Sequence, residues 1–304
     1  MLLVIVGPTA SGKSALALKI AKKFRGEIIS ADSRQIYKGL EIGSGQLTKK
    51  EMMGVPHHLL GIASPKRRYT VTQYRRHALF AIQRILKKGK LPILVGGTPL
   101  YIYALIDGWD IPEVKPNPLL RKRLEKLSIQ ELFAKLRKLD PARAKTVDTK
   151  NKRRLIRALE IVISTGKPVP KLKMKPLPYP VLFLGLQKPR EELKKNIRKR
   201  FLAMLKKGLL KEVRQLRSAG LSWRHIESFG LEYREVSQYL QGKLSKTHMI
   251  EQTVRATKDF SRRQLTWFKK DDRVHWFRNS RSALAFLAGR GILHSVRVSG
   301  YSKV

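Results

Sequence analysis

The chain has 304 residues, and hydrophobic residues make up 42% of them, so it can bury a packed core and is not globally disordered. It contains no cysteine, which excludes disulfide bonds and thiolate metal sites and fits a reducing compartment. Lysine and arginine number 65 against 22 aspartates and glutamates, a net charge of +43. This excess favours nucleic acid as a partner, the alternatives being a basic surface without such a partner and an acidic membrane surface.

The N-terminal run Met1–Val6 is apolar, but it is short and a glycine-rich loop follows it at once. We interpret it as a buried first strand rather than an export signal. No stretch approaches the roughly 18–20 apolar residues that a membrane-spanning helix needs. We therefore expect no membrane association and a cytoplasmic location.

The first third of the chain alternates between strand and helix patterns. Short apolar runs predict parallel strands, and amphipathic segments between them predict helices. The alternation predicts a doubly wound α/β core whose ligands bind at the carboxyl ends of the strands, where Gly7, Asp32 and Gly96–Thr98 fall. The predicted strands are Leu2–Val6, Glu27–Ala31 and Leu91–Val95, and the predicted helices are Ser14–Phe24 and Val71–Lys87.

Prolines and charged helical segments mark a change of character after about residue 111. We predict a mostly helical insertion over residues 112–178, a catalytic core formed by residues 1–111 and 179–290, and a tail, 291–304, without a recognisable motif. The insertion is expected to hold helices at Leu119–Leu127, Ile129–Leu139 and Lys152–Thr165. After it we expect a strand at Val181–Leu186 and helices at Arg190–Lys206, Leu209–Ala219, Tyr233–Leu240 and His248–Lys269, so that the C-terminal part is helical.

The segment Gly7-Pro8-Thr9-Ala10-Ser11-Gly12-Lys13-Ser14 matches the phosphate-binding loop G-x-x-x-x-G-K-[ST] between a predicted strand and a predicted helix. Backbone N–H groups of such a loop and the start of its helix face phosphate oxygens. Lys13 adds positive charge, and the Ser14 hydroxyl can ligate Mg²⁺. This arrangement predicts a P-loop NTPase-like core that binds a diphosphate.

Asp32 is an acidic residue at the end of a predicted strand. A P-loop kinase or ATPase usually carries an aspartate at a strand end to hold Mg²⁺, but strand Leu91–Val95 ends in Gly96-Gly97-Thr98. Asp32 follows the second strand instead, where its carboxylate can act as a general base toward a second substrate. The alternative for Asp32 is a turn or helix-cap residue.

Six segments, taken together and in this order, resemble the tRNA dimethylallyltransferase (isopentenyltransferase) family over about residues 3–270. The resemblance implies transfer of a dimethylallyl group from dimethylallyl diphosphate to the N6 amino group of the adenine next to the anticodon, tRNA position 37, which forms N6-isopentenyladenosine. It also implies Mg²⁺ as cofactor and the tRNA anticodon stem-loop as partner, and we expect a monomer. The segments are residues 7–14, 30–39, 55–60, 91–98, 151–160 and 262–268.

The resemblance implies three groups of site residues. Lys13, Asp32 and Thr98 would be catalytic, with Asp32 as the base and Thr98 in contact with the target nucleotide. The diphosphate would be held by Gly7, Pro8, Thr9, Ala10, Ser11, Gly12, Lys13, Ser14 and Arg200, with Ser14 as the metal ligand. The tRNA would be held by Asp32, Ser33, Arg34, Gln35 and Thr98 and, in the insertion, by Arg153, Arg154, Leu155, Ile156 and Arg157.

The sequence departs from the family's pattern where Asn196 stands in place of the first arginine of the pair that ends at Arg200. Outside the motifs, we interpret His57 and His58 as structural, because neighbours on an extended segment point to opposite sides. The charged run Arg121–Arg123 and the pair Lys194–Lys195 are interpreted mainly as solvated charge.

Three other functions remain as alternatives. A small-molecule kinase of the shikimate-kinase type also has a P-loop, but it leaves the long basic C-terminal half without a role. A non-enzymatic RNA-binding P-loop protein would not need Asp32 and Thr98 beside the loop. Prenylation of free adenine nucleotides is closer, although the charge of +43 argues for a polymer as acceptor.

Overall fold

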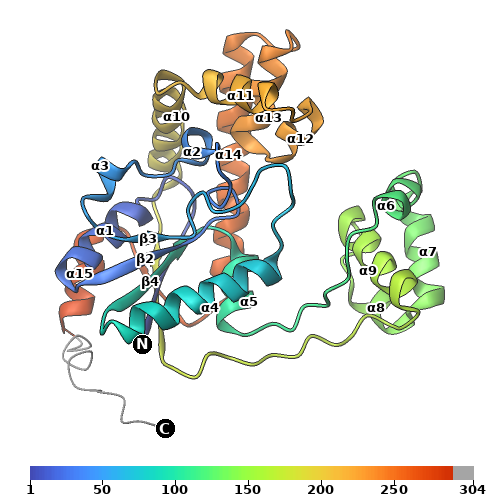
Figure 1. Ribbon diagram of the computed structural model, residues 1–304, viewed down its shortest axis with the longest axis horizontal. Helices are drawn as coiled ribbons and strands as arrows, with labels where there is room; N and C mark the ends of the chain where they lie inside the picture. Colours follow the sequence, from blue (N-terminus) through green and yellow to red (C-terminus); the bar gives the residue numbers. More distant parts are fainter. Residues whose placement is uncertain (290–304) are drawn as a thin grey trace. The chain divides into compact units, whose positions relative to one another are not determined.

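The computed structural model describes residues 1–289 (Figure 1). The described chain divides into two compact units, which we call the core unit (Met1–Ile106 with residues 177–289) and the inserted unit (Asp107–Pro176). The inserted unit starts at residue 107 where the sequence suggests 112, and ends at 176 where the sequence suggests 178. The expected tail, residues 291–304, lies outside the described residues.

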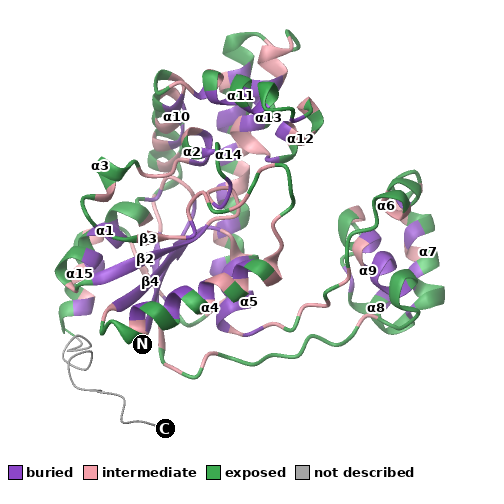
Figure 2. Cartoon of the chain, viewed as in Figure 1, coloured by how far each residue is buried: buried purple, intermediate pink, exposed green. Residues whose placement is uncertain are grey.

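The core unit is built on a six-stranded sheet in the order β3-β2-β4-β1-β5-β6, in which all the pairings are parallel. Parallel strands are covered on both faces, and β2 and β4 are accordingly buried along their whole length (Figure 2). The predicted α/β class with a P-loop-like parallel sheet is confirmed. The strands are β1 (Leu2–Val6), β2 (Gly26–Ala31), β3 (His57–His58), β4 (Leu91–Gly96), β5 (Val181–Leu186) and β6 (Val274–Phe277).

Helices cover both faces of this sheet. Leu16 and Ile20 of α1 and Leu287 of α15 share one hydrophobic core with Leu3 and Ile93 of the strands. Figure 1 shows α4 on the opposite side of β2 and β4 from α1. The helices of the core unit are α1 (Lys13–Lys23), α2 (Glu41–Ser44), α3 (Lys49–Met52), α4 (Val71–Lys87), α5 (Pro99–Ile106), α10 (Arg190–Lys206), α11 (Leu209–Ser218), α12 (Trp223–Ser228), α13 (Leu231–Leu240), α14 (Lys246–Phe268) and α15 (Ser280–Gly289).

Local sequence signals explain where several of these helices begin. Thr70 and Gln73 form a capping box at the start of α4, in which each side chain accepts a hydrogen bond from the other residue's backbone. Pro99 is the first residue of α5, a position where its missing N–H costs nothing. No helix within residues 1–289 is long and apolar enough to cross a lipid bilayer.

The inserted unit is a small helical bundle with a core of its own, formed in part by Leu132, Leu136, Leu155 and Leu159. Side chains of Asn117, Ser128, Asp140 and Asn151 each accept a backbone hydrogen bond at the start of one helix, the preferred chemistry at that position. Its helices are α6 (Pro118–Glu125), α7 (Ile129–Leu139), α8 (Pro141–Thr146) and α9 (Lys152–Thr165).

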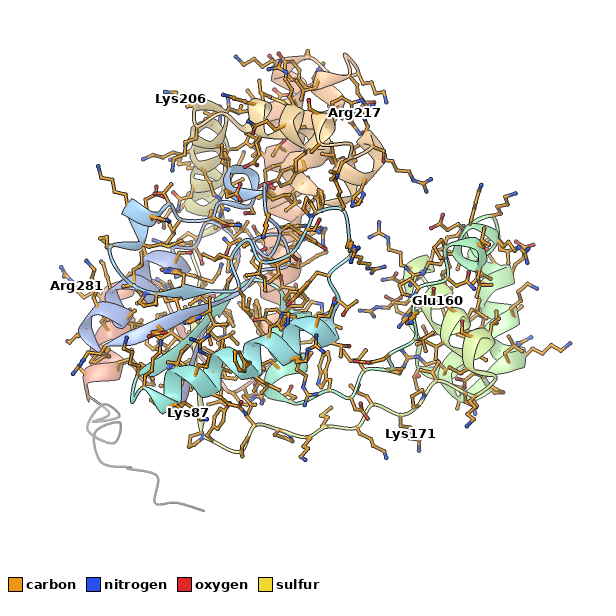
Figure 3. The ribbon with its side chains drawn as sticks, viewed as in Figure 1. Lys87, Glu160, Lys171, Lys206, Arg217 and Arg281 are labelled. Carbon is orange, nitrogen blue, oxygen red and sulfur yellow. The ribbon has the colours of Figure 1, made fainter. Side chains whose placement is uncertain are left out.

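Basic side chains are distributed over many elements of the core unit. The labelled Lys87, Lys206, Arg217 and Arg281 belong to α4, α10, α11 and α15 (Figure 3). The net charge of +43 is therefore spread over the molecule and not confined to one helix face.

Candidate active site

The phosphate-binding loop connects β1 to α1 and needs unusual backbone angles. Gly7, Ala10 and Gly12 all have positive φ values, of 143°, 62° and 98°. Gly12 caps α1, so that Lys13 is the first helical residue and Ser14 the second. The N–H groups in the first turn of α1 have no partner within the helix, and together with the positive end of the helix dipole they lie beside the loop, as anion binding requires.

Lys13 lies half-buried within this loop, and its Nζ donates a hydrogen bond of 2.6 Å to the Pro8 carbonyl oxygen. Burial and the nearby Arg200 lower the pKa of Lys13 from its ordinary value to about 7, while attraction to Asp32 acts in the opposite direction. A bound anion would favour the charged form, because it adds a further negative charge next to Lys13.

Arg200 of α10 reaches the same loop from a distant part of the sequence. Its Nη1 donates to Thr9 Oγ1 at 3.0 Å, and its Nη2 donates to the Ser44 carbonyl oxygen at 3.1 Å. Gly45 leaves space for the guanidinium, since a Cβ at that position would run into Nη2. The predicted neighbourhood of Arg200 and the P-loop is present, although its role toward a diphosphate stays a proposal.

Helix α2, whose last residue Ser44 holds Arg200, is itself fixed by a buried glutamate. Glu212 accepts backbone hydrogen bonds from Ile42 at 2.6 Å and Gly43 at 2.9 Å, and a third from the Tyr233 hydroxyl at 2.9 Å. Burial nevertheless raises the pKa of Glu212. This carboxylate caps the start of α2 and so orients the carbonyl that Arg200 uses.

Asp32 and Thr98 follow the adjacent strands β2 and β4, and hydrogen bonds join their two loops. Thr98 Oγ1 accepts from the Ser33 N–H at 3.1 Å, and the Thr98 N–H donates to the Ala31 carbonyl oxygen at 3.2 Å. Asp32 Oδ1 accepts a hydrogen bond from the Arg34 N–H at 2.8 Å. This oxygen therefore stabilises a turn, as the alternative interpretation of Asp32 expects. Within residues 1–289 no group donates a hydrogen bond to Oδ2.

The side-chain amide of Gln35 is hydrogen-bonded to other groups of the core unit. Its Oε1 accepts from Ser30 Oγ at 2.8 Å, and its Nε2 lies 3.3 Å from the Gly45 carbonyl oxygen. This arrangement argues against a direct tRNA contact through the Gln35 amide, and places the residue in support of the turn beside Arg200. Ser33 and Arg34 remain half-exposed next to Asp32.

Two further polar residues of this region were not identified from the sequence. Gln264 of α14 accepts a hydrogen bond of 2.9 Å from the Thr9 N–H, and its motif, residues 262–268, was the available signal. Glu232 is half-buried at the start of α13, and burial raises its pKa although Arg200 acts to lower it. Glu232 lies in residues 228–234, where the sequence departs from the family's pattern, and its proximity to Arg200 cannot be predicted because the two belong to distant segments.

The predicted tRNA-binding segment of the inserted unit divides into exposed and buried positions. Arg153 and Arg154 are exposed, and Arg154 lies 3.6 Å from a carboxylate oxygen of Asp148. Leu155 and Ile156 are 0% and 7% exposed and belong to the core of the unit. Their placement argues against direct RNA contact by these two side chains, because consecutive residues of a helix face different directions.

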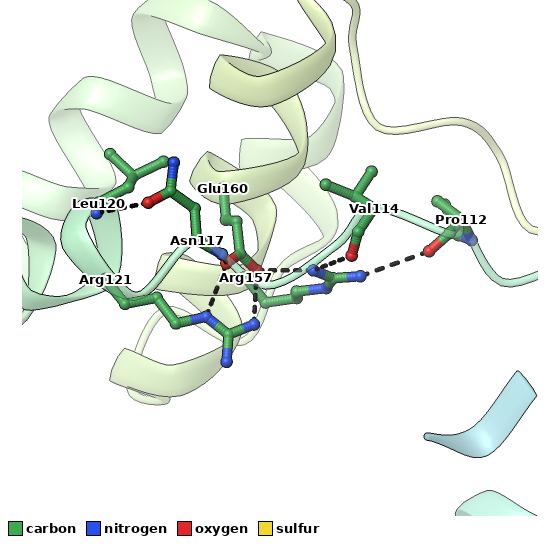
Figure 4. Close-up of polar contacts among 7 residues, drawn as sticks. All are labelled: Pro112, Val114, Asn117, Leu120, Arg121, Arg157 and Glu160. Atoms are coloured by element: carbon green, nitrogen blue, oxygen red, sulfur yellow. Dashed lines mark hydrogen bonds and ion pairs between the residues drawn. The ribbon is translucent and has the colours of Figure 1, made fainter. Parts of the chain in front are cut away.

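Arg157 and Arg121 share one buried carboxylate, Glu160 (Figure 4). Each places a nitrogen 2.6 Å from Glu160 Oε2, and the Asn117 N–H donates to Oε1 at 2.8 Å. These partners hold the pKa of Glu160 at about 2, despite its burial. Arg157 also donates to the Val114 carbonyl oxygen at 3.1 Å. Arg157 is thus placed as a structural residue more than an RNA contact, and the interpretation of Arg121 as solvated charge is wrong.

The paired histidines also have partners within the fold. The His57 Nδ1 lies 2.8 Å from the Val55 carbonyl oxygen, and the His58 Nε2 lies 2.8 Å from a carboxylate oxygen of the buried Glu27. These contacts give both residues a packing role at the sheet edge.

Comparison with known proteins agrees with this geometry. The family model described as "IPP transferase" matches residues 35–271, and the one described as "Isopentenyl transferase" matches residues 1–63. The tRNA dimethylallyltransferase of Carboxydothermus hydrogenoformans is 40% identical over 291 residues, covering 93% of each chain. That of Pelotomaculum thermopropionicum is 42% identical over 283 residues, covering 91% of this chain and 90% of the relative.

Solved structures show the same relationship. The tRNA isopentenylpyrophosphate transferase of Bacillus halodurans matches with a TM-score of 0.71 at 34% identity, covering 97% of each chain. A eukaryotic dimethylallyltransferase acting on tRNA matches with a TM-score of 0.81 at 27% identity, covering 97% of this chain and 79% of that one. The chain belongs to the IPP transferase family, together with these tRNA dimethylallyltransferases.

Proposed function

We propose that this protein transfers the dimethylallyl group of dimethylallyl diphosphate to N6 of the adenine at tRNA position 37, forming N6-isopentenyladenosine. The observation that carries the proposal is that the phosphate-binding loop and the Asp32 carboxylate lie at the same edge of the sheet. Lys13 and Arg200 lie at the phosphate-binding loop, and Gln264 joins this loop to Gly97. The next residue, Thr98, accepts a hydrogen bond from the Ser33 N–H beside Asp32. A diphosphate bound by the loop would therefore sit beside a carboxylate that can serve as a base.

The proposed chemistry assigns each group one task. The adenine N6 attacks the first carbon of the dimethylallyl group, and the bond from that carbon to the diphosphate oxygen breaks. The Asp32 carboxylate accepts the proton that N6 loses, as a general base. Lys13, Arg200 and the N–H groups at the start of α1 stabilise the negative charge of the departing diphosphate. The adenine must leave the base stack to reach these groups.

Mg²⁺ is proposed as cofactor through Ser14, whose exposed hydroxyl lies at the start of α1. Within residues 1–289 no cluster of three or more acidic, histidine or cysteine side chains could form a metal cage. In a phosphate-binding loop the Ser/Thr hydroxyl at this position ligates Mg²⁺ together with substrate phosphates and water, so Ser14 fits this ion. When bound, Mg²⁺ would neutralise part of the diphosphate charge.

The tRNA is proposed to be held by its phosphates, which the net charge of +43 attracts, and through the exposed Arg153 and Arg154 of the inserted unit. We also propose that the protein acts as a monomer, since the P-loop, Asp32, Thr98 and Arg200 all come from one chain. We further propose a cytoplasmic location, which is consistent with tRNA as the substrate.

One assay tests the proposal and its alternatives together. Purified protein is incubated with radiolabelled dimethylallyl diphosphate and Mg²⁺, and offered tRNA, AMP or ATP in parallel. Label is expected in tRNA alone, and a tRNA with guanosine at position 37 should stay unlabelled. Label in AMP or ATP would instead identify a free-nucleotide prenyltransferase. Consumption of ATP with a small alcohol, and no label in tRNA, would favour the kinase alternative.

A further inference from the structure

Gln264 connects two loops of the active site through a single side chain. It lies on α14 and is 4% exposed. Its Oε1 accepts the Thr9 N–H of the phosphate-binding loop at 2.9 Å, and its Nε2 donates to the Gly97 carbonyl oxygen at 2.6 Å. Thr9 and Gly97 follow β1 and β4, which are neighbours in the sheet.

The chemistry of an amide suits this position. One planar group offers both an acceptor and a donor, which is what a backbone N–H and a backbone carbonyl require from a common partner. Because the site is buried, a side chain without these atoms would leave both backbone groups unpaired. Gly97 is part of the same arrangement, since a Cβ there would run into Gln264 Nε2.

Each end of this amide leads to one side of the proposed reaction. On the side of the diphosphate substrate, Gln264 binds the backbone of Thr9. The hydroxyl of the same residue accepts a hydrogen bond from Arg200 and so orients its guanidinium. On the side of the tRNA substrate, Gln264 binds Gly97, which precedes Thr98. Thr98 Oγ1 accepts a hydrogen bond from the Ser33 N–H beside Asp32. The Thr9 N–H is bonded to Gln264, which argues against the predicted role of this N–H as a phosphate donor.

We infer that Gln264 is a positioning residue for prenyl transfer, which fixes the spacing between the diphosphate-binding loop and the Thr98–Asp32 side of the site. This inference rests on the proposed function. A variant without the amide should bind each substrate separately, because the groups that touch diphosphate and tRNA remain. The transfer step should slow, since small errors in the alignment of two reactants cost about 10²-fold in rate.

The test is a single-turnover measurement at saturating dimethylallyl diphosphate and tRNA. We expect the rate constant of Gln264→Met to fall about 10²-fold, with both substrate dissociation constants within about threefold of wild type. The rate constant reports only on folded molecules, and the amplitude reports how many there are, so a loss of stability affects the second quantity alone. The matched control is Gln241→Met, which removes an amide bonded to Glu227 and to the Ser237 carbonyl oxygen on α13.

A second variant separates positioning from packing. Gln264→Glu keeps the shape, but only its protonated form can donate to the Gly97 carbonyl oxygen. Its rate relative to wild type should therefore rise as the pH falls, whereas that of Gln264→Met should stay low at every pH. If Gln264→Met does not fold, the pH series of Gln264→Glu decides, because a change in its rate relative to wild type across pH depends on the protonation of one side chain and not on the fraction of folded protein.

The outcomes are distinct. A wild-type rate constant in Gln264→Met, or a relative rate of Gln264→Glu that does not change with pH, overturns the inference while tRNA prenylation by wild type stands. Wild-type protein that transfers nothing to tRNA overturns the proposed function and this inference with it.

Discussion

Arg200 donates a hydrogen bond of 3.0 Å to the Thr9 hydroxyl, although the two residues lie 191 positions apart in the sequence. The contact brings a second cation to a loop that already contains Lys13, and the proximity of the two cations contributes to the lowered pKa of Lys13. An opposite charge bound near both cations favours the charged form of Lys13. A bound diphosphate should therefore raise the pKa of Lys13.

Replacing Arg200 should weaken donor binding without affecting tRNA. We expect Arg200→Gln to raise the dissociation constant of dimethylallyl diphosphate about tenfold or more, because one charge-assisted contact to phosphate is lost. The affinity for tRNA should stay within about twofold. Titration calorimetry with each ligand measures both quantities, and Arg198→Gln, an exposed change on the same helix, is the control. Equal donor affinity in Arg200→Gln and wild type would remove Arg200 from the diphosphate site.

Donor binding should be accompanied by proton uptake near pH 8. Lys13 has a pKa of about 7 in the free protein, so it is largely neutral at pH 8, and a bound diphosphate favours its charged form. Donor affinity should accordingly fall as the pH rises above 7. Calorimetry of inorganic diphosphate binding in buffers of different ionisation enthalpy counts the protons taken up. Lys13→Arg, which is always charged, should show little uptake. Uptake that is the same in both proteins would contradict the assignment to Lys13.

Arg157 should matter for stability more than for tRNA. Removing it takes one partner from the buried carboxylate of Glu160 and leaves Arg121 and the Asn117 N–H in place. We expect Arg157→Ala to destabilise the inserted unit by about 2 kcal/mol. Hydrogen exchange of the α9 amides measures the loss locally. Unchanged protection of α9 in this variant would show that the Glu160 cluster does not hold the unit together.

Arg153 and Arg154 should show the opposite behaviour. The double variant Arg153→Ala/Arg154→Ala is expected to lower tRNA affinity and to reduce the salt dependence by about 0.7 in slope for each lost phosphate contact. Stability and donor affinity should not change, because both side chains are exposed. Lys194→Ala/Lys195→Ala on α10 removes the same charge and serves as the control. Equal effects of the two double variants would reduce the role of Arg153 and Arg154 to general attraction.

The sequence predicted those parts of the molecule that local patterns determine. The apolar runs of β1 and β5 and the helices α4, α7, α9 and α10 have the predicted bounds, because periodicity and capping are local properties. Helix α5 was missed because it is apolar on all sides and shows no helical period, and β6 because it is only four residues long. Contacts between distant segments, such as Gln264 with Thr9, have no local signal.

The segment from Arg153 to Arg157 illustrates the same limit at the level of function. Its resemblance to a family motif marks all five residues equally, but a helix presents them to different surroundings. Only burial separates the two core residues, Leu155 and Ile156, from exposed Arg153 and Arg154. Arg157 is paired with Glu160, which lies only three positions later in the sequence. The burial of Glu160, however, depends on the packing of the whole bundle and cannot be predicted from this spacing.

The general-base role of Asp32 is the central claim, and the variant Asp32→Asn tests it most directly. The amide keeps the size of the side chain and an oxygen for the Arg34 N–H, but it cannot take the proton from N6. We measure the single-turnover rate constant at saturating dimethylallyl diphosphate and tRNA, together with both dissociation constants and the melting temperature. The account predicts normal binding, a melting temperature close to that of wild type, and a rate constant about 10²–10⁴-fold lower. A stably folded Asp32→Asn protein that prenylates tRNA at the wild-type rate would contradict it.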